Sequence, residues 1–293
     1  MQFVIIFLVI LFFYVHILDQ YKKSEDLEIY EMDYISNQNL QEVCAIKQPV
    51  LFQFPGDPIV LPDVDDAEIK VWDKNDFEKE ETNIDYVILP FRSFKGLMKS
   101  DPKGHYFTDN NQDFLEDSNI REVDPFLKPN MTVHSKYDLL MGSGSLPLQY
   151  HISDRMFLYV ASGKISVKMS PWKSHKELHP VLDYDNYTFF SKTDPWSSAA
   201  TAATSNGVKW LDFDVVEGYM LFVPAYWWYS IKFASADVKV IGIQYKTVMN
   251  LCAHVPDICR YYLQFHNTKK VPAKKIEFPI EPVEQPVEEP ISA

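Results

Sequence analysis

Cysteine is scarce in this chain, and the scarcity excludes two classes of small cross-linked protein. The 293 residues include only Cys44, Cys252 and Cys259, too few for a disulfide scaffold. No Cys-x-x-Cys pair is present, so zinc-ribbon and thioredoxin-like sites are not expected. Cys252 and Cys259 could close a short loop in an oxidising compartment. The alternative is that all three thiols are buried and pack as small hydrophobic groups.

Long basic runs are also missing. Lys and Arg number 28 against 41 Asp and Glu, which gives a formal net charge of −13. Because an acidic surface repels phosphate backbones, we expect no nucleic-acid partner. The sequence has no Ser-His-Asp arrangement and no phosphate-cradling glycine loop, so it supports neither of those enzyme classes. A hydrophobic content of 46% with 15% aromatic residues predicts a folded chain with a sizeable core.

One long apolar run lies at the N-terminus. Residues 1–18 contain no charged side chain and would form a helix of roughly 27 Å, close to the thickness of a bilayer core. We therefore predict a single-pass transmembrane anchor at residues 1–18 and a juxtamembrane linker at 19–27. A cleaved signal peptide is the alternative, but no Ala, Gly or Ser precedes Ser24 and no Lys or Arg precedes the run.

Two signals disagree about the side of the membrane on which the rest of the chain lies. Lys22 and Lys23 favour a cytoplasmic domain by the positive-inside rule. The glycosylation sequons at Asn130 and Asn186 favour a lumenal one. The sequence leaves both orientations open.

Short apolar runs separated by turn residues make up most of the remaining chain. They predict strands at 48–54, 67–73, 84–89, 156–161, 164–169, 186–190, 219–223, 227–233 and 238–245. Helical spacing is found near 38–45, 91–99 and 256–266. The pattern predicts an all-β-dominated fold with flanking helices. Residues 267–293 are rich in Pro, Glu and Lys and predict a disordered tail.

Two windows carry a resemblance to one family. Residues 218–229 read Gly-Tyr-Met-Leu-Phe-Val-Pro-Ala-Tyr-Trp-Trp-Tyr, 147–151 read Pro-Leu-Gln-Tyr-His, and 157–164 read Phe-Leu-Tyr-Val-Ala-Ser-Gly-Lys. They resemble windows of the Jumonji-C-type, cupin-like oxygenases: Gly-Asp-x-Leu-Phe-x-Pro-x-x-Trp-Trp-His, and Thr-Pro-Leu-His-Tyr-Asp followed by Gln-Val-x-Gly-x-Lys. The resemblance implies a double-stranded β-helix (a jelly-roll, or cupin-like barrel) over residues 28–266.

The family's metal positions are altered in this chain. Ferrous 2-oxoglutarate oxygenases hold iron with two histidines and one carboxylate. In this family they come from His-x-Asp on one strand and from the histidine after the two tryptophans, a position that is Tyr229 here. Depending on the alignment register, the first two positions are Gln149 and His151, Tyr150 and Ile152, or His151 and Ser153. None of these pairs contains a carboxylate.

An iron site built on His151 and Asp154 is an alternative that requires a bulge, because a spacing of three places the two side chains on opposite faces of a regular strand. The family's cosubstrate lysine would fall on Ile165, one position after Lys164. Alternate side chains of the implied barrel point inward. The candidates for lining a pocket are therefore Tyr159, Lys164, Tyr226 and Trp228.

These features predict a membrane-anchored cupin-like domain that acts as a binding or scaffold module, with no iron and no other cofactor. Its expected partners are the membrane, through residues 1–18, and a protein or small molecule. One alternative is an active hydroxylase that uses Fe(II) and 2-oxoglutarate at an atypical site. A second alternative is a metal-free binder of a small molecule or glycan.

Overall fold

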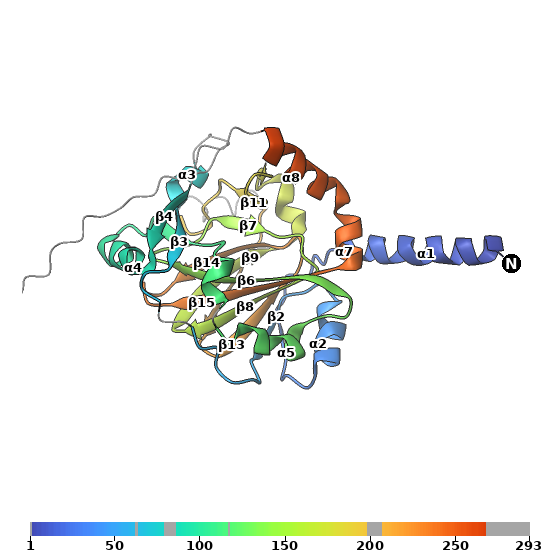
Figure 1. Ribbon diagram of the computed structural model, residues 1–293, viewed down its shortest axis with the longest axis horizontal. Helices are drawn as coiled ribbons and strands as arrows, with labels where there is room; N and C mark the ends of the chain where they lie inside the picture. Colours follow the sequence, from blue (N-terminus) through green and yellow to red (C-terminus); the bar gives the residue numbers. More distant parts are fainter. Residues whose placement is uncertain (1, 62–63, 79–85, 117, 198–206, 268–293) are drawn as a thin grey trace, which may run out of the picture.

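Two β-sheets dominate the computed structural model (Figure 1), which describes residues 2–61, 64–78, 86–116, 118–197 and 207–267. One sheet has nine strands and the other has six. Helices flank the sheets, and one apolar helix projects from the N-terminal end. The expected β-dominated fold is therefore confirmed at this level. The proposed disordered tail at 267–293 lies, apart from Asn267, outside the described residues.

The nine-stranded sheet has the order β1-β2-β13-β8-β15-β6-β5-β3-β4. Its strands are β1 (Tyr30–Glu31), β2 (Val50–Gln53), β3 (Glu68–Asp73), β4 (Tyr86–Pro90), β5 (Tyr106–Thr108), β6 (Thr132–Gly142), β8 (Arg155–Ser162), β13 (Tyr219–Val223) and β15 (Lys239–Thr247). β1 pairs with β2 in parallel, and the other neighbours are antiparallel.

The six-stranded sheet has the order β10-β11-β7-β14-β9-β12 and is antiparallel throughout. Its strands are β7 (Leu148–Tyr150), β9 (Lys164–Ser170), β10 (Pro180–Asp183), β11 (Thr188–Ser191), β12 (Leu211–Val216) and β14 (Trp228–Phe233).

The two sheets share a hydrophobic core. Strand β8 shows the alternation that produces it, because successive side chains of a strand point to opposite faces. Leu158 and Val160 pack with Val167 and Ile231 of the six-stranded sheet, whereas Phe157 and Tyr159 belong to a second core on the other face. A strand buried on both faces explains why the sequence window 156–161 is apolar at almost every position.

Helices cover the outer face of the nine-stranded sheet, where the second core includes Leu40 of α2, Phe94 and Met98 of α4, and Leu127 of α5. The helices are α1 (Gln2–Gln20), α2 (Asn37–Cys44), α3 (Lys74–Glu78), α4 (Phe91–Ser100), α5 (Asp124–Leu127), α7 (Val248–Ala253) and α8 (Val255–Asn267), with single 3-10 turns at Gln112–Leu115, Ile120–Val123 and Trp172–Lys176.

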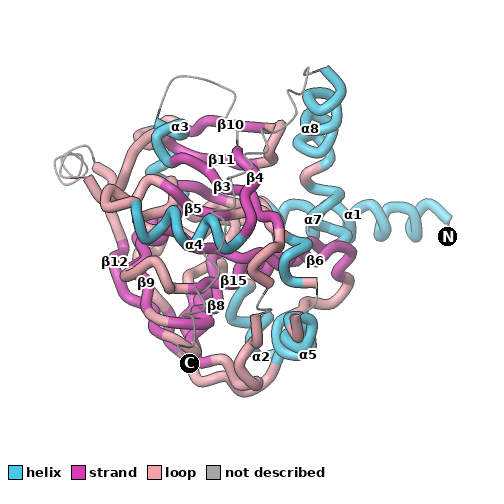
Figure 2. Tube along the Cα trace, turned by 60° about the vertical axis from the view of Figure 1, so that its left-hand side comes forward, coloured by secondary structure: helices cyan, strands magenta, loops and turns pink. Residues whose placement is uncertain are grey.

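Helix α1 is apolar, with a mean hydropathy of 2.3 over 18 residues, and almost all of its side chains are exposed. It is long and apolar enough to cross a membrane, although a signal sequence would have the same properties. Its last residue, Gln20, accepts a hydrogen bond from Asn250 of α7 at 3.2 Å, and the Tyr21 hydroxyl donates to the Ala253 carbonyl. In the turned view of Figure 2, α7 and α8 lie beside the point where α1 leaves the domain.

Two expectations drawn from the sequence are corrected. Cys252 and Cys259 are both exposed and unpaired, so they neither close a loop nor join Cys44 in the core. Strand β6, with 11 residues the longest of the described strands, is not among the strands predicted from the sequence, and its first half carries several of the charged residues discussed below.

A buried ion group joins α2 to the start of β8. Lys47 is 1% exposed, and its Nζ lies 3.6 Å from the Asp154 carboxylate, which also contacts Arg155 at 3.0 Å. Burial lowers the pKa of Lys47. Because a buried ammonium is costly to leave unpaired, this carboxylate is essential to the local structure.

We expect Asp154→Asn to lower the free energy of unfolding by about 3–5 kcal/mol, since it leaves Lys47 without its counter-charge. The measurement is urea denaturation of the full chain in a mild detergent. Asp212→Asn is the control, because the Asp212–Lys168 pair is 3.7 Å long and largely exposed and should contribute less than about 1 kcal/mol. Equal losses in the two variants would contradict this account.

Candidate functional site

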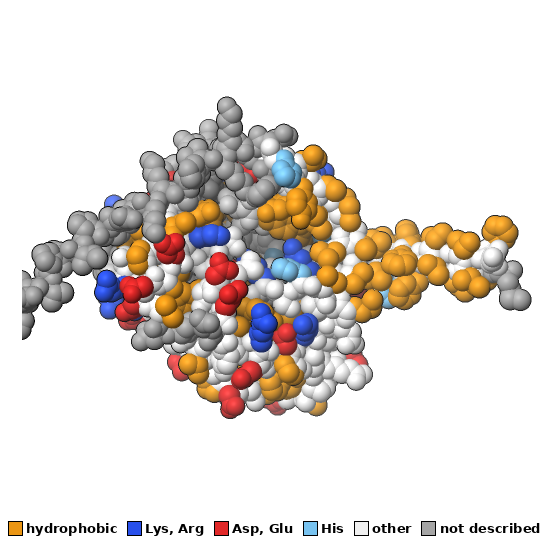
Figure 3. All heavy atoms as spheres, viewed as in Figure 1, with side chains coloured by type: hydrophobic (Ala, Val, Ile, Leu, Met, Phe, Trp, Pro, Cys, Tyr) orange, Lys and Arg blue, Asp and Glu red, His pale blue; other side chains and the backbone are white. Residues whose placement is uncertain are grey.

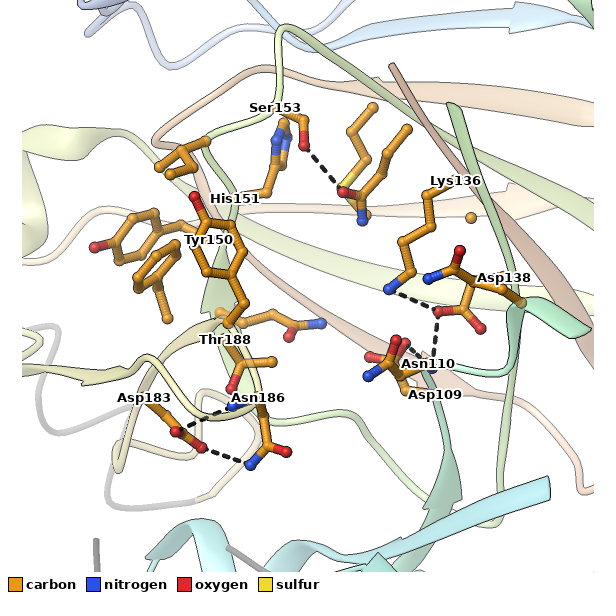
Figure 4. Close-up of a pocket in the computed structure, with 18 of the residues that line it drawn as sticks. Asp109, Asn110, Lys136, Asp138, Tyr150, His151, Ser153, Asp183, Asn186 and Thr188 are labelled. Carbon is orange, nitrogen blue, oxygen red and sulfur yellow. Dashed lines mark hydrogen bonds and ion pairs between the residues drawn. The ribbon is translucent and has the colours of Figure 1, made fainter. Parts of the chain in front are cut away.

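A cavity of ≈ 650 Å³ is bordered by residues of both sheets and of α8. In the space-filling view, basic and histidine side chains gather at a hollow beside the apolar surface of α8 (Figure 3). Figure 4 shows that polar groups approach this space from different walls: Lys136 and Asp138 from β6, Asp183 and Thr188 from the β10 and β11 region, and His151 from the end of β7.

Three of the residues that the sequence resemblance aligns with metal ligands meet at the cavity. Gln149 of β7 pairs directly with Tyr229 of β14, and the centroids of the His151 and Tyr229 rings are 6.5 Å apart. All three border the cavity, as does Tyr150. The arrangement corresponds to the alignment register in which Gln149 and His151 occupy the first two ligand positions.

His151 is held by the protein through one ring nitrogen. Its Nε2 donates to the Val223 carbonyl oxygen at 2.9 Å, which fixes the tautomer and leaves Nδ1 as an acceptor. Nδ1 is buried and makes no hydrogen bond with the described residues. Burial lowers the pKa of His151 to about 4, so the imidazole is neutral at pH 7.

The residues at these positions do not fit the iron site of the Jumonji-C-type oxygenases. Gln149 carries no charge, and burial raises the pKa of Tyr229 well above 10, with further contributions from Asp109 and Asp138. Tyr229 is therefore a neutral phenol, and the set supplies no anionic donor for a ferrous ion. Among the described residues, no group of three or more His, Cys, Asp or Glu side chains could hold a metal ion.

The structure also separates His151 from Asp154. The Asp154 carboxylate pairs with Lys47 and Arg155 instead of facing the cavity. The bulge that would bring His151 and Asp154 onto one metal is therefore not formed.

None of the four residues predicted to line a pocket borders this cavity. Tyr159 packs against Phe54, on the outer face of the nine-stranded sheet, and Lys164 is half-exposed, with an ion pair to Asp214 at 2.7 Å. Tyr226 hydrogen-bonds to His254 at 2.8 Å, and Trp228 packs against Tyr150 in a core separate from the one between the sheets. The alternation along β14 places Tyr229, and not Trp228, toward the cavity.

The sequence reasoning missed the charged wall formed by β6 and β15. His134, Lys136 and Asp138 follow one another at a spacing of two along β6, so they share one face of the strand. Lys246 of β15 lies opposite His134 in the antiparallel register. The spacing of two was visible in the sequence, but no apolar alternation accompanied it.

Asp138 is fully engaged within this wall. It accepts hydrogen bonds from the backbone amides of Asn110 and Asn111, both at 2.7 Å, and pairs with Lys136 at 3.1 Å. The neighbouring Asp109 borders the cavity, and burial beside the Asp138 carboxylate raises its pKa. At pH 7 Asp109 is therefore mostly the neutral acid.

Lys246 has no carboxylate within ion-pair distance among the described residues. Its Nζ lies 4.7 Å from the centroid of the Tyr187 ring. Burial, with repulsion from Lys136, lowers the pKa of Lys246 to about 8. At pH 7 the ammonium is still mostly protonated, and its charge is compensated only weakly.

Comparison with known proteins does not assign this chain to a family. No protein-family model matches the chain, and no curated protein matches it.

We expect no His151-dependent binding of Mn²⁺, used in place of ferrous iron, because the site lacks an anionic donor. Calorimetry of the full chain with Mn²⁺ and 2-oxoglutarate, compared with His151→Ala, measures this. Stoichiometric binding that disappears in His151→Ala would contradict the donor-set argument and restore the hydroxylase alternative.

We expect Asp109→Asn to become stabilising as the pH rises. The folded-state pKa of Asp109 lies above its unfolded value, so the wild type loses stability as pH increases from the unfolded pKa toward the folded one, by about 1.4 kcal/mol per pH unit for one proton. The free energy of unfolding of Asp109→Asn, relative to that of the wild type, should be about 1–3 kcal/mol higher at pH 8 than at pH 5. A difference independent of pH would show that Asp109 is ionised in the folded protein.

Proposed function

We propose that this chain is a membrane-anchored binding module with a Jumonji-C-like jelly-roll fold, and that its interior cavity holds a small molecule without the iron of the related oxygenases. The order of the central strands supports the fold. β13-β8-β15-β6 and β7-β14-β9-β12 are two antiparallel layers of four strands, as in an eight-stranded jelly-roll. They share a core between them.

The anchor is supported by α1 and by its attachment to the domain. A 19-residue apolar helix that buries almost none of its surface within the protein requires another apolar environment. The hydrogen bonds from Asn250 to Gln20 and from Tyr21 to Ala253 hold its end against α7. The rest of the domain would therefore lie close to the bilayer.

The cavity itself is the observation that carries the binding function. Its ≈ 650 Å³ lies within the range of small-molecule sites, and its lining combines aromatic rings with the unpaired Nδ1 of His151 and with Lys246. A scaffold that recognised another protein by its outer surface would not require such an interior space. The hydroxylase alternative has no comparable support from the residues at the metal positions.

Gly242 offers a way to test this function. It lies on β15 and borders the cavity, and a Cβ placed on it would meet only Leu140 at 3.5 Å and Asp138 at 3.9 Å. A small side chain therefore fits without a clash, and a larger one would extend into the open space.

We expect Gly242→Leu to abolish small-molecule binding while the protein remains folded. The full chain would be purified in detergent, and the compounds it retains would be extracted and identified by mass spectrometry. Compounds present in the wild type should be lost from Gly242→Leu.

Gly96→Leu is the matched control, because Gly96 is exposed on α4 and a Cβ there meets nothing within 4 Å. This variant should retain the same compounds as the wild type. Identical extracts from all three proteins, or no specific compound in any of them, would refute the binding function.

A further inference from the structure

The basic side chains at the cavity are concentrated on two neighbouring strands. Lys246 of β15 pairs in register with His134 of β6, and Lys136 lies two residues further along β6. All three border the cavity. Repulsion among them is recorded in the lowered pKa values of His134 and Lys246, to which burial contributes most. Such a cluster is stabilised when an anion joins it.

The carboxylates at the same cavity do not supply that anion. Asp138 already binds Lys136 and two backbone amides. Asp183 accepts from Asn186 Nδ2 at 2.8 Å and from the Asp185 amide at 2.9 Å, which ties it into the turn between β10 and β11. Asp185 also has interactions of its own. Asp109 is held as the neutral acid beside Asp138. Lys246 therefore remains the cation that an incoming anion would reach.

The remaining walls are apolar and aromatic. Trp72 and Phe107 border the cavity from β3 and β5, Phe189 borders it from β11, and Tyr261 borders it from α8. Leu251 and Ile258 add aliphatic surface from α7 and α8. A fully hydrated inorganic ion would leave these walls without contacts, whereas a ligand with a hydrophobic body would cover them.

We propose that the ligand of this cavity is a hydrophobic organic anion, whose carboxylate or phosphate binds between Lys246, Lys136 and His134 and whose apolar body packs against the aromatic walls. This inference rests on the proposed binding function and specifies its ligand class.

The same chemistry has two sources. Helix α7 is hydrogen-bonded to the end of α1. Because α7 and α8 also line the cavity, an amphiphile leaving a bilayer would meet these walls first. A water-soluble aromatic acid would satisfy the same contacts.

The experiment uses the full chain in phosphatidylcholine nanodiscs and compares acids with neutral analogues by calorimetry. Oleate against oleyl alcohol represents the membrane source, and 1-naphthoate against 1-naphthamide represents the soluble source. The variants are Lys246→Met, which keeps an unbranched side chain and removes its charge, and Lys99→Met, a control at an exposed lysine of α4. Subtracting the signal of nanodiscs that contain no protein removes partitioning into lipid.

In the wild type and in Lys99→Met, at least one acid should bind about tenfold or more tightly than its neutral analogue, because a charge-assisted contact contributes that much. Lys246→Met should lose this preference. Lys246-dependent binding of oleate alone would identify a ligand from the membrane, and Lys246-dependent binding of 1-naphthoate alone would identify a soluble ligand.

A second readout requires no variant. Lys246 loses its proton near pH 8, so acid binding to the wild type should weaken about tenfold between pH 7 and pH 9. Three groups near Lys246 do not titrate in this window, because the pKa of Lys136 is raised, the pKa of His134 is lowered, and the pKa of Tyr187 is raised. Asp109 ionises as the pH rises and acts in the same direction, so the fall should be smaller in Lys246→Met but still present.

Neutral analogues binding as tightly as both acids, acids insensitive to Lys246→Met, or no binding of either acid would each overturn this inference. The compounds retained in the Gly242→Leu experiment distinguish failure of the binding function from failure of the anionic ligand class. If Gly242→Leu still removes a compound from the protein while the acids show no dependence on Lys246, the binding function stands and the anionic ligand class is wrong. If neither effect is seen, both are wrong.

Discussion

The hydrogen bond from His151 to the Val223 carbonyl ties the two sheets together at the cavity. Val223 ends β13 of the nine-stranded sheet, and His151 follows β7 of the six-stranded sheet. A second bond, from the Tyr226 amide to the His151 carbonyl at 2.9 Å, joins the same two segments. Both groups are buried, so losing either bond would leave an unpaired polar atom away from water. The side chain that resembles a metal ligand in the sequence therefore has a structural role, and only its Nδ1 remains available to a ligand.

The strands with two apolar faces were the easiest to predict from the sequence. β8 and β13 are buried on both sides, so their windows are continuously apolar and bounded by turn residues. The direction of individual side chains was harder. Tyr226, Trp228 and Tyr229 are all large and aromatic, and composition does not distinguish an inward from an outward position. The register was set by the pairing of Tyr229 with Gln149, a contact between residues 80 positions apart that no local pattern contains.

Strand β6 was not predicted, because neither face of its first half is apolar. His134, Lys136 and Asp138 face the cavity, while Tyr137 on the other side donates a hydrogen bond to Asp124 at 2.5 Å. Tyr245 of the neighbouring strand reaches the same carboxylate at 2.8 Å. A strand between the charged wall of the cavity and a partly buried carboxylate lacks the apolar alternation on which strand prediction depends. The residues most relevant to binding were therefore in the segment that sequence patterns described least well.

The charge of the whole chain and the charge of the cavity wall have opposite signs, and this difference bears on how a ligand would arrive. A net charge of −13 repels a dissolved anion at long range, whereas Lys246 and Lys136 attract it only at short range, within about 8–10 Å at physiological ionic strength. A soluble acid would therefore associate slowly at low salt and faster as added salt screens the repulsion. An amphiphile that moves from a bilayer along α7 and α8 would not cross the acidic surface, and its association would depend little on salt. In the proposed membrane-anchored arrangement, the attachment of α1 to α7 would thus affect more than the position of the domain, because it would determine which face of the cavity lies nearest to the membrane.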